Sequence, residues 1–344
     1  MTGKTAVFRA SASTKIGGGH IVRCMALARE LTARDWRCIF ACGLETKSTI
    51  PMIAEFETME IDESNPSIEP HLIREGLGQD VPVLVVDHYE RGEAFETACR
   101  SWAGAIAVID DLANRRHDAD LLLDQSGGRV AEAYIGLVPE NCDLKVGPAY
   151  SLLRHRFSEL SKVRKPRPCT KGPRIFVSMG STDENNLSEA VVATVLSSIP
   201  NSEIDLLLSA HAPHLGKLRT AFAEIRNVTI HVNVPEPADI MVHASFAVGT
   251  AGINLWERCA LGIPSLIHVA ASNQRSNADH VVAYGGGISI GEGPNVEVKA
   301  LADALADIMS SGDRLRRLSD AASRICDGHG ANRLANEIER ITMG

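Results

Sequence analysis

The sequence predicts an α/β protein built from two doubly wound, Rossmann-like domains that face each other across a cleft. Near-continuous runs of Val, Ile and Leu alternate with helical stretches, which is typical of parallel strands covered on both faces. This alternation stops at about 158–172 and then starts again, which indicates a second domain. The chain has 344 residues, enough for two separate cores. We therefore expect domains at 1–157 and 173–344, joined by a linker at 158–172.

The first domain is expected to alternate strands with helices. Its apolar runs place strands at 5–11, 36–42, 81–88, 105–111 and 120–125. The first helix is predicted over 20–34, where Ile21, Met25 and Leu31 fall near one face.

The second domain is expected to repeat this pattern beyond the linker, which is basic, contains proline and lacks a hydrophobic period. Its apolar runs place strands at 174–180, 204–209, 228–232, 246–249 and 264–269. The segments expected to be helical are 185–198, 252–261, 274–284 and the whole of 300–342.

Composition narrows the functional classes. A net charge of −8 and an aromatic content of 4% argue against a nucleic-acid-binding surface. The eight cysteines form no C-x-x-C pair, so neither a disulfide framework nor a zinc site is expected. No apolar run reaches the roughly 18 residues of a membrane span, and the first residues lack a secretory leader. We expect a cytoplasmic protein without a nucleic-acid or membrane partner.

A glycine-rich turn lies between the first predicted strand and the first predicted helix. Gly17, Gly18 and Gly19 allow close backbone approach, and the helix that follows directs its positive end at the same spot, so an anion is expected there. His20 stands in the first helical turn, where the helix dipole favours the neutral imidazole that a general base requires. The alternative is a histidine that only caps a turn. Arg23 would reach a phosphate or form a surface ion pair.

Polar residues also follow two strands of the first domain. Asp87 and Tyr89 come at the end of the strand 81–88, and ligands bind at the carboxyl ends of strands in open α/β sheets. Either residue would contact a sugar or orient His20, and a plain turn with a partly buried tyrosine is the competing interpretation. Asp110 and Asp111 end the next strand, and a helix cap is favoured over a metal site because no further ligands have suitable spacing.

The second domain contains two turns of small residues that precede predicted helices. Met179, Gly180 and Ser181 form the first turn, which suits a phosphate but is also common in ordinary βα loops. Gly249 and Gly252 bracket the second turn, where a diphosphate would fit against the helix N-terminus. Tight packing between helix and strand is the alternative explanation for these glycines.

Three polar residues near this second turn are further candidates. Glu257 lies one to two turns inside the predicted helix and would accept hydrogen bonds from ribose hydroxyls, unless it is a surface acid. Asn273 and Gln274 follow the strand 264–269 and would position a sugar or a water, unless they belong to an ordinary helix cap.

Taken together and in this order, these segments resemble a known family. IGGGHIVRC, VVDHYE, VIDDLANRRHDADLLLDQ, GPAYSLLR, FVSMGSTDENN, WERCALGIPS and SNQ are similar to segments of the UDP-2,4-diacetamido-2,4,6-trideoxy-β-L-altropyranose hydrolases of pseudaminic acid biosynthesis. That family is related in fold to the GT-B glycosyltransferases. The resemblance implies a UDP-sugar in the cleft between two domains, attack of water at the anomeric carbon, cleavage of the C–O bond with inversion, and release of UDP, with no metal or other cofactor.

The resemblance also implies roles for single residues. His20 falls on the family's essential histidine, Tyr89 and Asn273 on positions that line the sugar and the water, and Glu257 on the acid that holds the ribose in related transferases. A monomer is expected. An inverting glycosyltransferase and a non-catalytic nucleotide-sugar-binding protein remain alternatives. A nicotinamide dehydrogenase is disfavoured, because Val22 replaces the third glycine of its motif and Cys42 stands where an acid would end the second strand.

Overall fold

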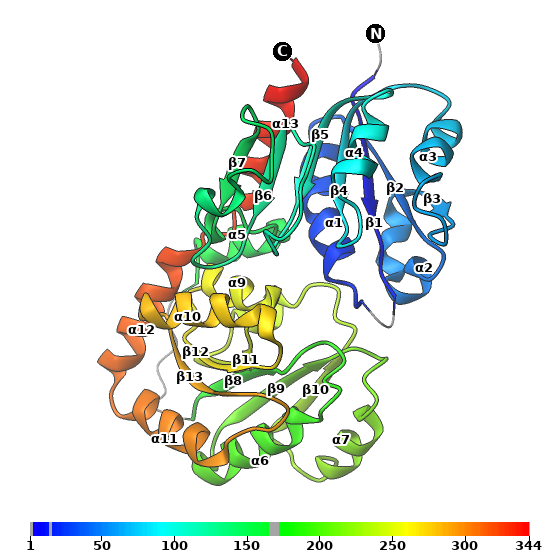
Figure 1. The fold of residues 1–344 in the computed structure, drawn as a ribbon. Helices are drawn as coiled ribbons and strands as arrows, with labels where there is room; N and C mark the ends of the chain where they lie inside the picture. Colours follow the sequence, from blue (N-terminus) through cyan, green and yellow to red (C-terminus); the bar gives the residue numbers. More distant parts are fainter. Residues whose placement is uncertain (1–2, 14–15, 165–171, 344) are drawn as a thin grey trace. The chain divides into compact units, whose positions relative to one another are not determined.

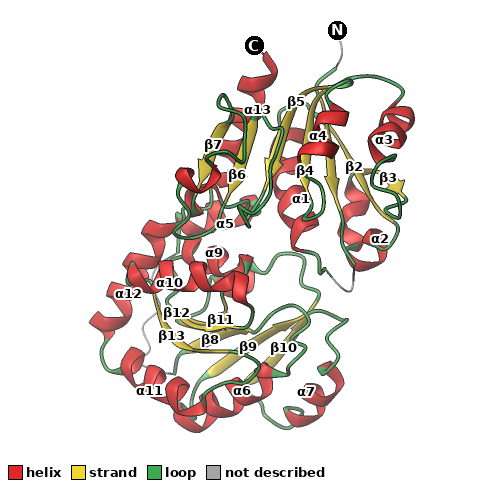
Figure 2. Ribbon diagram, viewed as in Figure 1, coloured by secondary structure: helices red, strands yellow, loops and turns green. Residues whose placement is uncertain are grey.

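The computed structural model describes residues 3–13, 16–164 and 172–343 (Figure 1). The chain divides into two compact units, one formed by Met1–His155 with His329–Gly344 and the other by Arg156–Gly328. Each unit is a parallel sheet flanked by helices (Figure 2). The predicted class, two doubly wound α/β sheets, is therefore confirmed.

The first unit contains a seven-stranded parallel sheet in the order β3-β2-β1-β4-β5-β6-β7. Its strands are β1 (Thr5–Ala10), β2 (Arg37–Gly43), β3 (Glu57–Ile61), β4 (Val81–Asp87), β5 (Ala103–Ile109), β6 (Leu121–Asp124) and β7 (Asp143–Val146). Its helices are α1 (Gly19–Thr32), α2 (Thr46–Thr49), α3 (Glu69–Leu77), α4 (Glu93–Cys99) and α13 (Gly330–Met343). The chain reverses its winding direction between β1 and β4, so ligands are expected at the carboxyl ends of these two strands.

Both faces of this sheet are buried, which explains the uninterrupted apolar runs of its central strands. Along β4, Val83 and Val85 pack into the core shared with α1 and α13, whereas Leu84 and Val86 pack into the core on the opposite face. A strand that is covered on both sides has no solvent face to require alternating polar residues.

The second unit contains a six-stranded parallel sheet in the order β10-β9-β8-β11-β12-β13, with the switch between β8 and β11. Its strands are β8 (Arg174–Ser178), β9 (Glu203–Leu208), β10 (Val228–Val232), β11 (Phe246–Thr250), β12 (Ser265–Val269) and β13 (Gly287–Glu292). Its helices are α6 (Leu187–Ser198), α7 (Leu215–Ala221), α8 (Ala238–Met241), α9 (Ile253–Ala260), α10 (Arg275–Ala283), α11 (Val298–Met309) and α12 (Gly312–Ile325).

The C-terminal segment differs from the prediction in two ways. The stretch 300–342 is not one continuous helix, since Ser311 caps the start of α12 and a non-helical segment separates α12 from α13. The last helix, α13, also belongs to the first unit, so the expected domain 173–344 ends at Gly328 instead. The apolar face of α13, with Leu334 and Ile338, is buried in the core that α1 covers.

The predicted linker at 158–172 is only partly described. Helix α5 (His155–Ser161) begins at the boundary between the units and occupies the first residues of the predicted linker, while 165–171 lie outside the described residues. No helix in the part of the chain that the structure describes has the length and apolar character of a membrane span.

Candidate functional site

A face of helix α1 carries three side chains that converge on one carboxylate. His20, Arg23 and Cys24 stand at positions i, i+3 and i+4 of the helix, which places them side by side. All three contact Asp87 at the carboxyl end of β4: His20 Nδ1 and Arg23 Nη2 each lie 2.6 Å from Oδ1, and Cys24 Sγ lies 3.5 Å from Oδ2. The Gly-His-x-x-Arg-Cys spacing thus has a structural meaning, since it directs three donors at the neighbouring strand.

Asp87 is ionised in this arrangement. Burial by itself raises the pKa of the Asp87 carboxyl, but the charge of Arg23 and the hydrogen bonds from Arg23 and His20 outweigh burial and hold the pKa well below its usual range. Arg23 also donates through Nε to Oδ2 over 2.6 Å, so the guanidinium grips the carboxylate with two nitrogens. Burial lowers the pKa of Arg23 and Asp87 raises it, with the net result well above the usual value. Asp87 is therefore a fixed negative charge behind His20.

The Asp87 contact determines which nitrogen of His20 carries the proton. An ionised carboxylate only accepts hydrogen bonds, so the nitrogen facing it, Nδ1, is the protonated one in the neutral ring. The lone pair then lies on Nε2, for which no described residue provides a hydrogen-bond partner. A neutral imidazole oriented in this way can take a proton through Nε2, and the Asp87 charge stabilises the cation that results.

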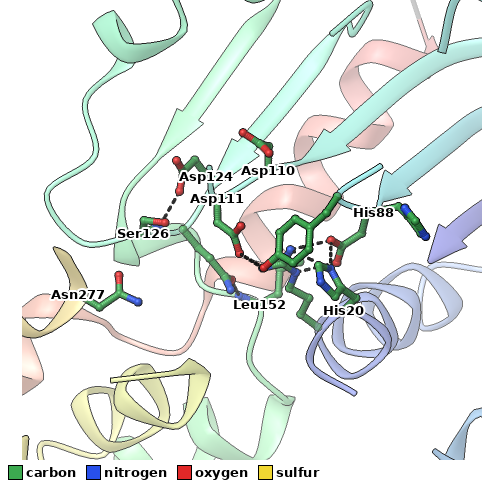
Figure 3. A network of polar contacts seen from close by, with 12 residues as sticks. His20, His88, Asp110, Asp111, Asp124, Ser126, Leu152 and Asn277 are labelled. Atoms are coloured by element: carbon green, nitrogen blue, oxygen red, sulfur yellow. Dashed lines mark hydrogen bonds and ion pairs between the residues drawn. The ribbon is translucent and has the colours of Figure 1, made fainter. Parts of the chain in front are cut away.

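Tyr89 also packs against the imidazole. The two rings form a T-shaped contact with a centroid distance of 4.5 Å and an interplanar angle of 86°. The Tyr89 hydroxyl donates to Asp111 Oδ2 over 3.4 Å, and the same oxygen accepts from Arg23 Nη1 over 3.0 Å (Figure 3). Burial and the Asp111 charge raise the pKa of Tyr89 to about 12, so the phenol stays protonated. The sequence motif that identified Asp87 and Tyr89 did not reveal this role of Asp111, because Asp111 follows a different strand, β5.

The glycine turn before α1 has the features expected of an anion site. Gly17 has a φ of +75°, and a Cβ added at Gly19 would meet no atom within 4 Å. Gly18 is a glycine for a packing reason, since its Cβ would lie 2.3 Å from Ile50 Cδ1. No side chain caps α1, and its first turn contains no acidic residue. The backbone N–H groups that a helix leaves unsatisfied at its start are therefore not engaged by a side-chain cap.

Arg23 was expected to contact a phosphate or to form a surface ion pair. Its side chain is instead buried and bound to Asp87 and Asp111. Its guanidinium orients and neutralises the two carboxylates behind His20.

In the second unit, the two glycines of the turn after β11 have different surroundings. Gly252 is the N-cap residue of α9, which has neither a side-chain cap nor an acid in its first turn, and only Gln274 Nε2 lies near its missing Cβ, at 3.9 Å. Gly249 instead makes room for Arg258, since an added Cβ would lie 2.4 Å from Arg258 Nη1 and 2.6 Å from the carbonyl oxygen of Ser178. Tight packing thus accounts for Gly249, while the space beside Gly252 is open.

The remaining candidates of the second unit lie around this turn. Glu257 is buried and accepts a hydrogen bond from Asn254 Nδ2 over 2.6 Å. Gln274 accepts from the backbone N–H of Ala270 over 3.2 Å, and its neighbour Asn273 is exposed. Gln274 is therefore brought to the Gly252 turn, and Glu257 lies on the helix that starts there.

The turn after β8 does not offer the helix N-terminus that was expected. Met179 is buried, Gly180 has a φ of +110° and Ser181 is exposed. Asp183, however, accepts hydrogen bonds from the backbone N–H groups of Leu187 and Ser188, at 2.8 and 2.9 Å, and so fills the start of α6 with a carboxylate. A phosphate at this position would be repelled, which leaves α9 as the uncapped helix of the two.

Two further carboxylates, those of Asp110 and Asp124, lie close to the His20 site (Figure 3). Tyr134 contacts Asp110 Oδ2 and Asp124 Oδ2 at 2.9 Å each, and Arg115 and Arg129 neutralise the two acids. Asp110 also accepts from the backbone N–H of residue 113, in a turn and not at a helix cap. No cluster of His, Cys, Asp or Glu suitable for a metal ion occurs among the described residues. These contacts brace the loops after β5 and β6 next to Asp111.

No protein-family model matches this chain. The chain is 29% identical over 224 residues to the UDP-2,4-diacetamido-2,4,6-trideoxy-β-L-altropyranose hydrolase of Campylobacter jejuni, an alignment that covers 64% of this chain and 75% of that protein. Among solved structures, UGT2 of Phytolacca americana in complex with UDP-2-fluoro-glucose and pterostilbene gives a TM-score of 0.68 at 14% identity, covering 99% of this chain and all of that one. A UDP-glucosyltransferase from Polygonum tinctorium gives 0.67 at 13% identity, covering 100% of both chains.

These similarities define the fold. The fold is that of the GT-B glycosyltransferases, as expected from the resemblance. The chain is also a distant relative of the Campylobacter hydrolase.

Proposed function

We propose that this chain hydrolyses a UDP-linked 2,4-diacetamido-2,4,6-trideoxy sugar of the altrose type, releasing UDP and the free sugar. The observation that carries the proposal is the His20–Asp87 pair, with Nδ1 held 2.6 Å from the carboxylate and the lone pair therefore on Nε2. The distant hydrolase of Campylobacter jejuni supports the choice of substrate, since its name states that reaction. No cofactor is required for it.

In the proposed reaction, His20 acts as the general base. Nε2 removes a proton from a water molecule while the water oxygen forms a bond to the anomeric carbon. The bond from that carbon to the phosphate oxygen breaks, and its electron pair leaves with UDP. A single displacement of this kind inverts the anomeric configuration. Asp87 stabilises the imidazolium that forms, which later gives its proton to solvent.

The phosphates of UDP are assigned to helix N-termini. The uncapped start of α9 at Gly252 is proposed to bind the diphosphate, and Glu257 the ribose. The uncapped start of α1, with Gly17 and Gly19, is proposed to stabilise the charge that develops as UDP leaves. Tyr89 and Asn273 would orient the sugar and the water.

An inverting glycosyltransferase is the second candidate, and the similarity to a UDP-glucosyltransferase favours it. The same base would then remove the proton of an acceptor hydroxyl instead of that of water. The two candidates differ in one product, since only the hydrolase releases a free sugar without an acceptor.

Turnover of candidate UDP-diacetamido sugars in oxygen-18 water tests the proposal. We expect free sugar to form without any acceptor and to carry the label at the anomeric carbon. Label in UDP would mean attack at phosphorus and would contradict the proposal. Turnover only after addition of an acceptor would identify a transferase.

A further inference from the structure

A buried arginine lies behind the proposed phosphate-binding turn of the second unit. Arg258 is completely shielded from solvent on α9. Its Nη2 donates to the carbonyl oxygen of Thr250 over 2.5 Å, and its Nε to that of Asn254 over 3.3 Å. Among the described residues, Nη1 has no hydrogen-bond acceptor. The charge of the Glu257 carboxylate favours the protonated guanidinium and offsets part of the cost of burial.

A fully buried guanidinium with an unsatisfied N–H group is unusual in a folded protein. A buried charge is costly unless a counter-charge lies close to it. Burial lowers the pKa of Arg258 to about 10, so the side chain nevertheless remains a cation at neutral pH. The fold even makes room for it, since any side chain at Gly249 would collide with Nη1. A buried guanidinium with an unsatisfied Nη1 behind this turn is explained if an anionic ligand binds at the turn.

The hydrogen bonds of Arg258 indicate where that ligand lies. Arg258 holds the carbonyl of Thr250, and Asn277 Nδ2 holds the carbonyl of Ala251 over 3.1 Å. The N–H of a trans peptide points away from its C=O, so the N–H groups of Ala251 and Gly252 are directed away from these two side chains. Donation to a carbonyl also polarises the N–H of the same peptide, which makes it a stronger donor.

We propose that Arg258 is a positioning residue for the phosphate groups of a nucleoside diphosphate at the turn 250–252. The inference rests on the proposed function, because it takes the ligand of this turn to be the diphosphate of the sugar donor. Arg258 does not touch the ligand. It supplies a positive charge behind the turn and holds the Thr250 carbonyl, so that the backbone N–H groups face the phosphates.

Binding measurements with three probes separate this role from a purely structural one. UDP and inorganic pyrophosphate carry the phosphates, whereas uridine has none. We expect Arg258→Gln to raise the Kd of UDP and of pyrophosphate by about tenfold or more, as for loss of a hydrogen bond to a charged group. The Kd of uridine should change by less than about twofold on the same energy scale. Arg316→Met is the matched control, since it removes an exposed arginine of the same unit and should alter none of the three values.

The outcomes are distinguishable from failure of the proposed function. A wild-type chain that binds neither UDP nor pyrophosphate would contradict both proposals. Normal UDP binding by the wild type, with equal losses of UDP and uridine affinity in Arg258→Gln, would contradict only the role of Arg258. Unchanged pyrophosphate affinity would do the same.

A second variant serves if Arg258→Gln does not fold. In Arg258→Lys, a buried lysine loses its proton near neutral pH because burial disfavours the charged form. The pyrophosphate affinity of this variant should therefore fall as the pH rises from 6 to 9, relative to the wild type measured in parallel. Parallel pH dependence in the two proteins would overturn the inference.

Discussion

The two units use the switch points of their sheets in different ways. Each has a glycine-containing turn there that leads into a helix without a side-chain cap, after β1 in the first unit and after β11 in the second. In the first unit, the helix directs the ionisable groups of His20 and Arg23 at a carboxylate on the neighbouring strand. In the second unit, the helix keeps Arg258 buried under the turn, and its Nη1 has no hydrogen-bond acceptor among the described residues.

Under the proposed function, this difference means that one unit transfers a proton and the other binds the nucleotide. A paired imidazole and carboxylate can transfer a proton, whereas a turn backed by a buried cation can only bind an anion. Under the proposed function, variants of the first unit should change turnover, and variants of the second should change nucleotide affinity. The predictions below test that separation.

The largest expected effect is on turnover in His20→Ala. Loss of a general base lowers kcat by about 10²- to 10⁴-fold. The Kd of UDP, measured by calorimetry, should stay within about twofold of the wild-type value, since we assign UDP binding to the second unit. His71→Ala is the matched control, because that histidine is exposed on α3. Equal losses of turnover and UDP affinity in His20→Ala would break the comparison.

Asp87→Asn should reduce both turnover and stability. Without the carboxylate the imidazole loses its orientation, and kcat falls by about 10²-fold or more. Arg23 also loses its main buried partner, which lowers the free energy of unfolding by about 3 kcal/mol at pH 7. Urea unfolding and initial rates check the two effects.

The stability effect of Asp87→Asn has a defined pH dependence. The pKa of Asp87 is lowered in the folded state, so its stabilisation is present above the unfolded value near 4 and is lost as the pH falls below it. The difference in unfolding free energy between wild type and variant should therefore narrow below about pH 4. A difference that stays constant down to pH 3 would contradict this account of the carboxylate.

The two glycines of the second unit should separate packing from binding. Gly249→Ala places a methyl group 2.6 Å from the Ser178 carbonyl and should cost about 1–3 kcal/mol of stability. Gly252→Ala meets only a distant side-chain nitrogen, so stability should hold while the Kd of UDP rises by about tenfold through interference with N–H donors to a charged ligand. Thermal unfolding and UDP titration measure both, and a reversed order would refute the assignment.

The smallest effect is expected for Tyr89→Phe. The change removes one long hydrogen bond to Asp111, so kcat should fall by about fivefold and UDP affinity should stay constant. Because the pKa of Tyr89 is about 12, the ratio of wild-type to variant rates should be the same from pH 6 to 10. Tyr284→Phe, an exposed tyrosine of the second unit, is the control. A ratio that changes in this range would mean that the phenol ionises.

The sequence predicts the central strands because they are buried on both faces, and it misses three strands in which charged residues or glycines interrupt the apolar run. Two edge strands, β3 (ETMEI) and β7 (DLKV), contain charged residues and are largely half-buried, so no apolar run indicates them. In β13 (GISIGE) two glycines and an acid interrupt the pattern. The sequence also does not predict on which unit α13 packs, because the apolar face of an amphipathic helix does not specify the surface that covers it.

The candidate site divides in the same way. The turn before His20 and the residues after β4 follow from strand ends and glycine positions, which are local features of the sequence. The position of Arg258 does not follow from local sequence features. An arginine on an amphipathic helix ordinarily faces solvent, but Arg258 is buried in the fold. The sequence places Asp111 at the end of a strand, but it does not predict the contact with Tyr89, which follows a different strand.

Chemical rescue of His20→Ala by free imidazole tests the central claim most directly. If the missing group is a neutral imidazole that takes a proton from water, added imidazole should restore turnover in proportion to its unprotonated concentration. The product should again be free sugar labelled from oxygen-18 water. Rescue that is absent in a variant still able to bind UDP, or turnover by the unrescued variant near the wild-type rate, would contradict the claim.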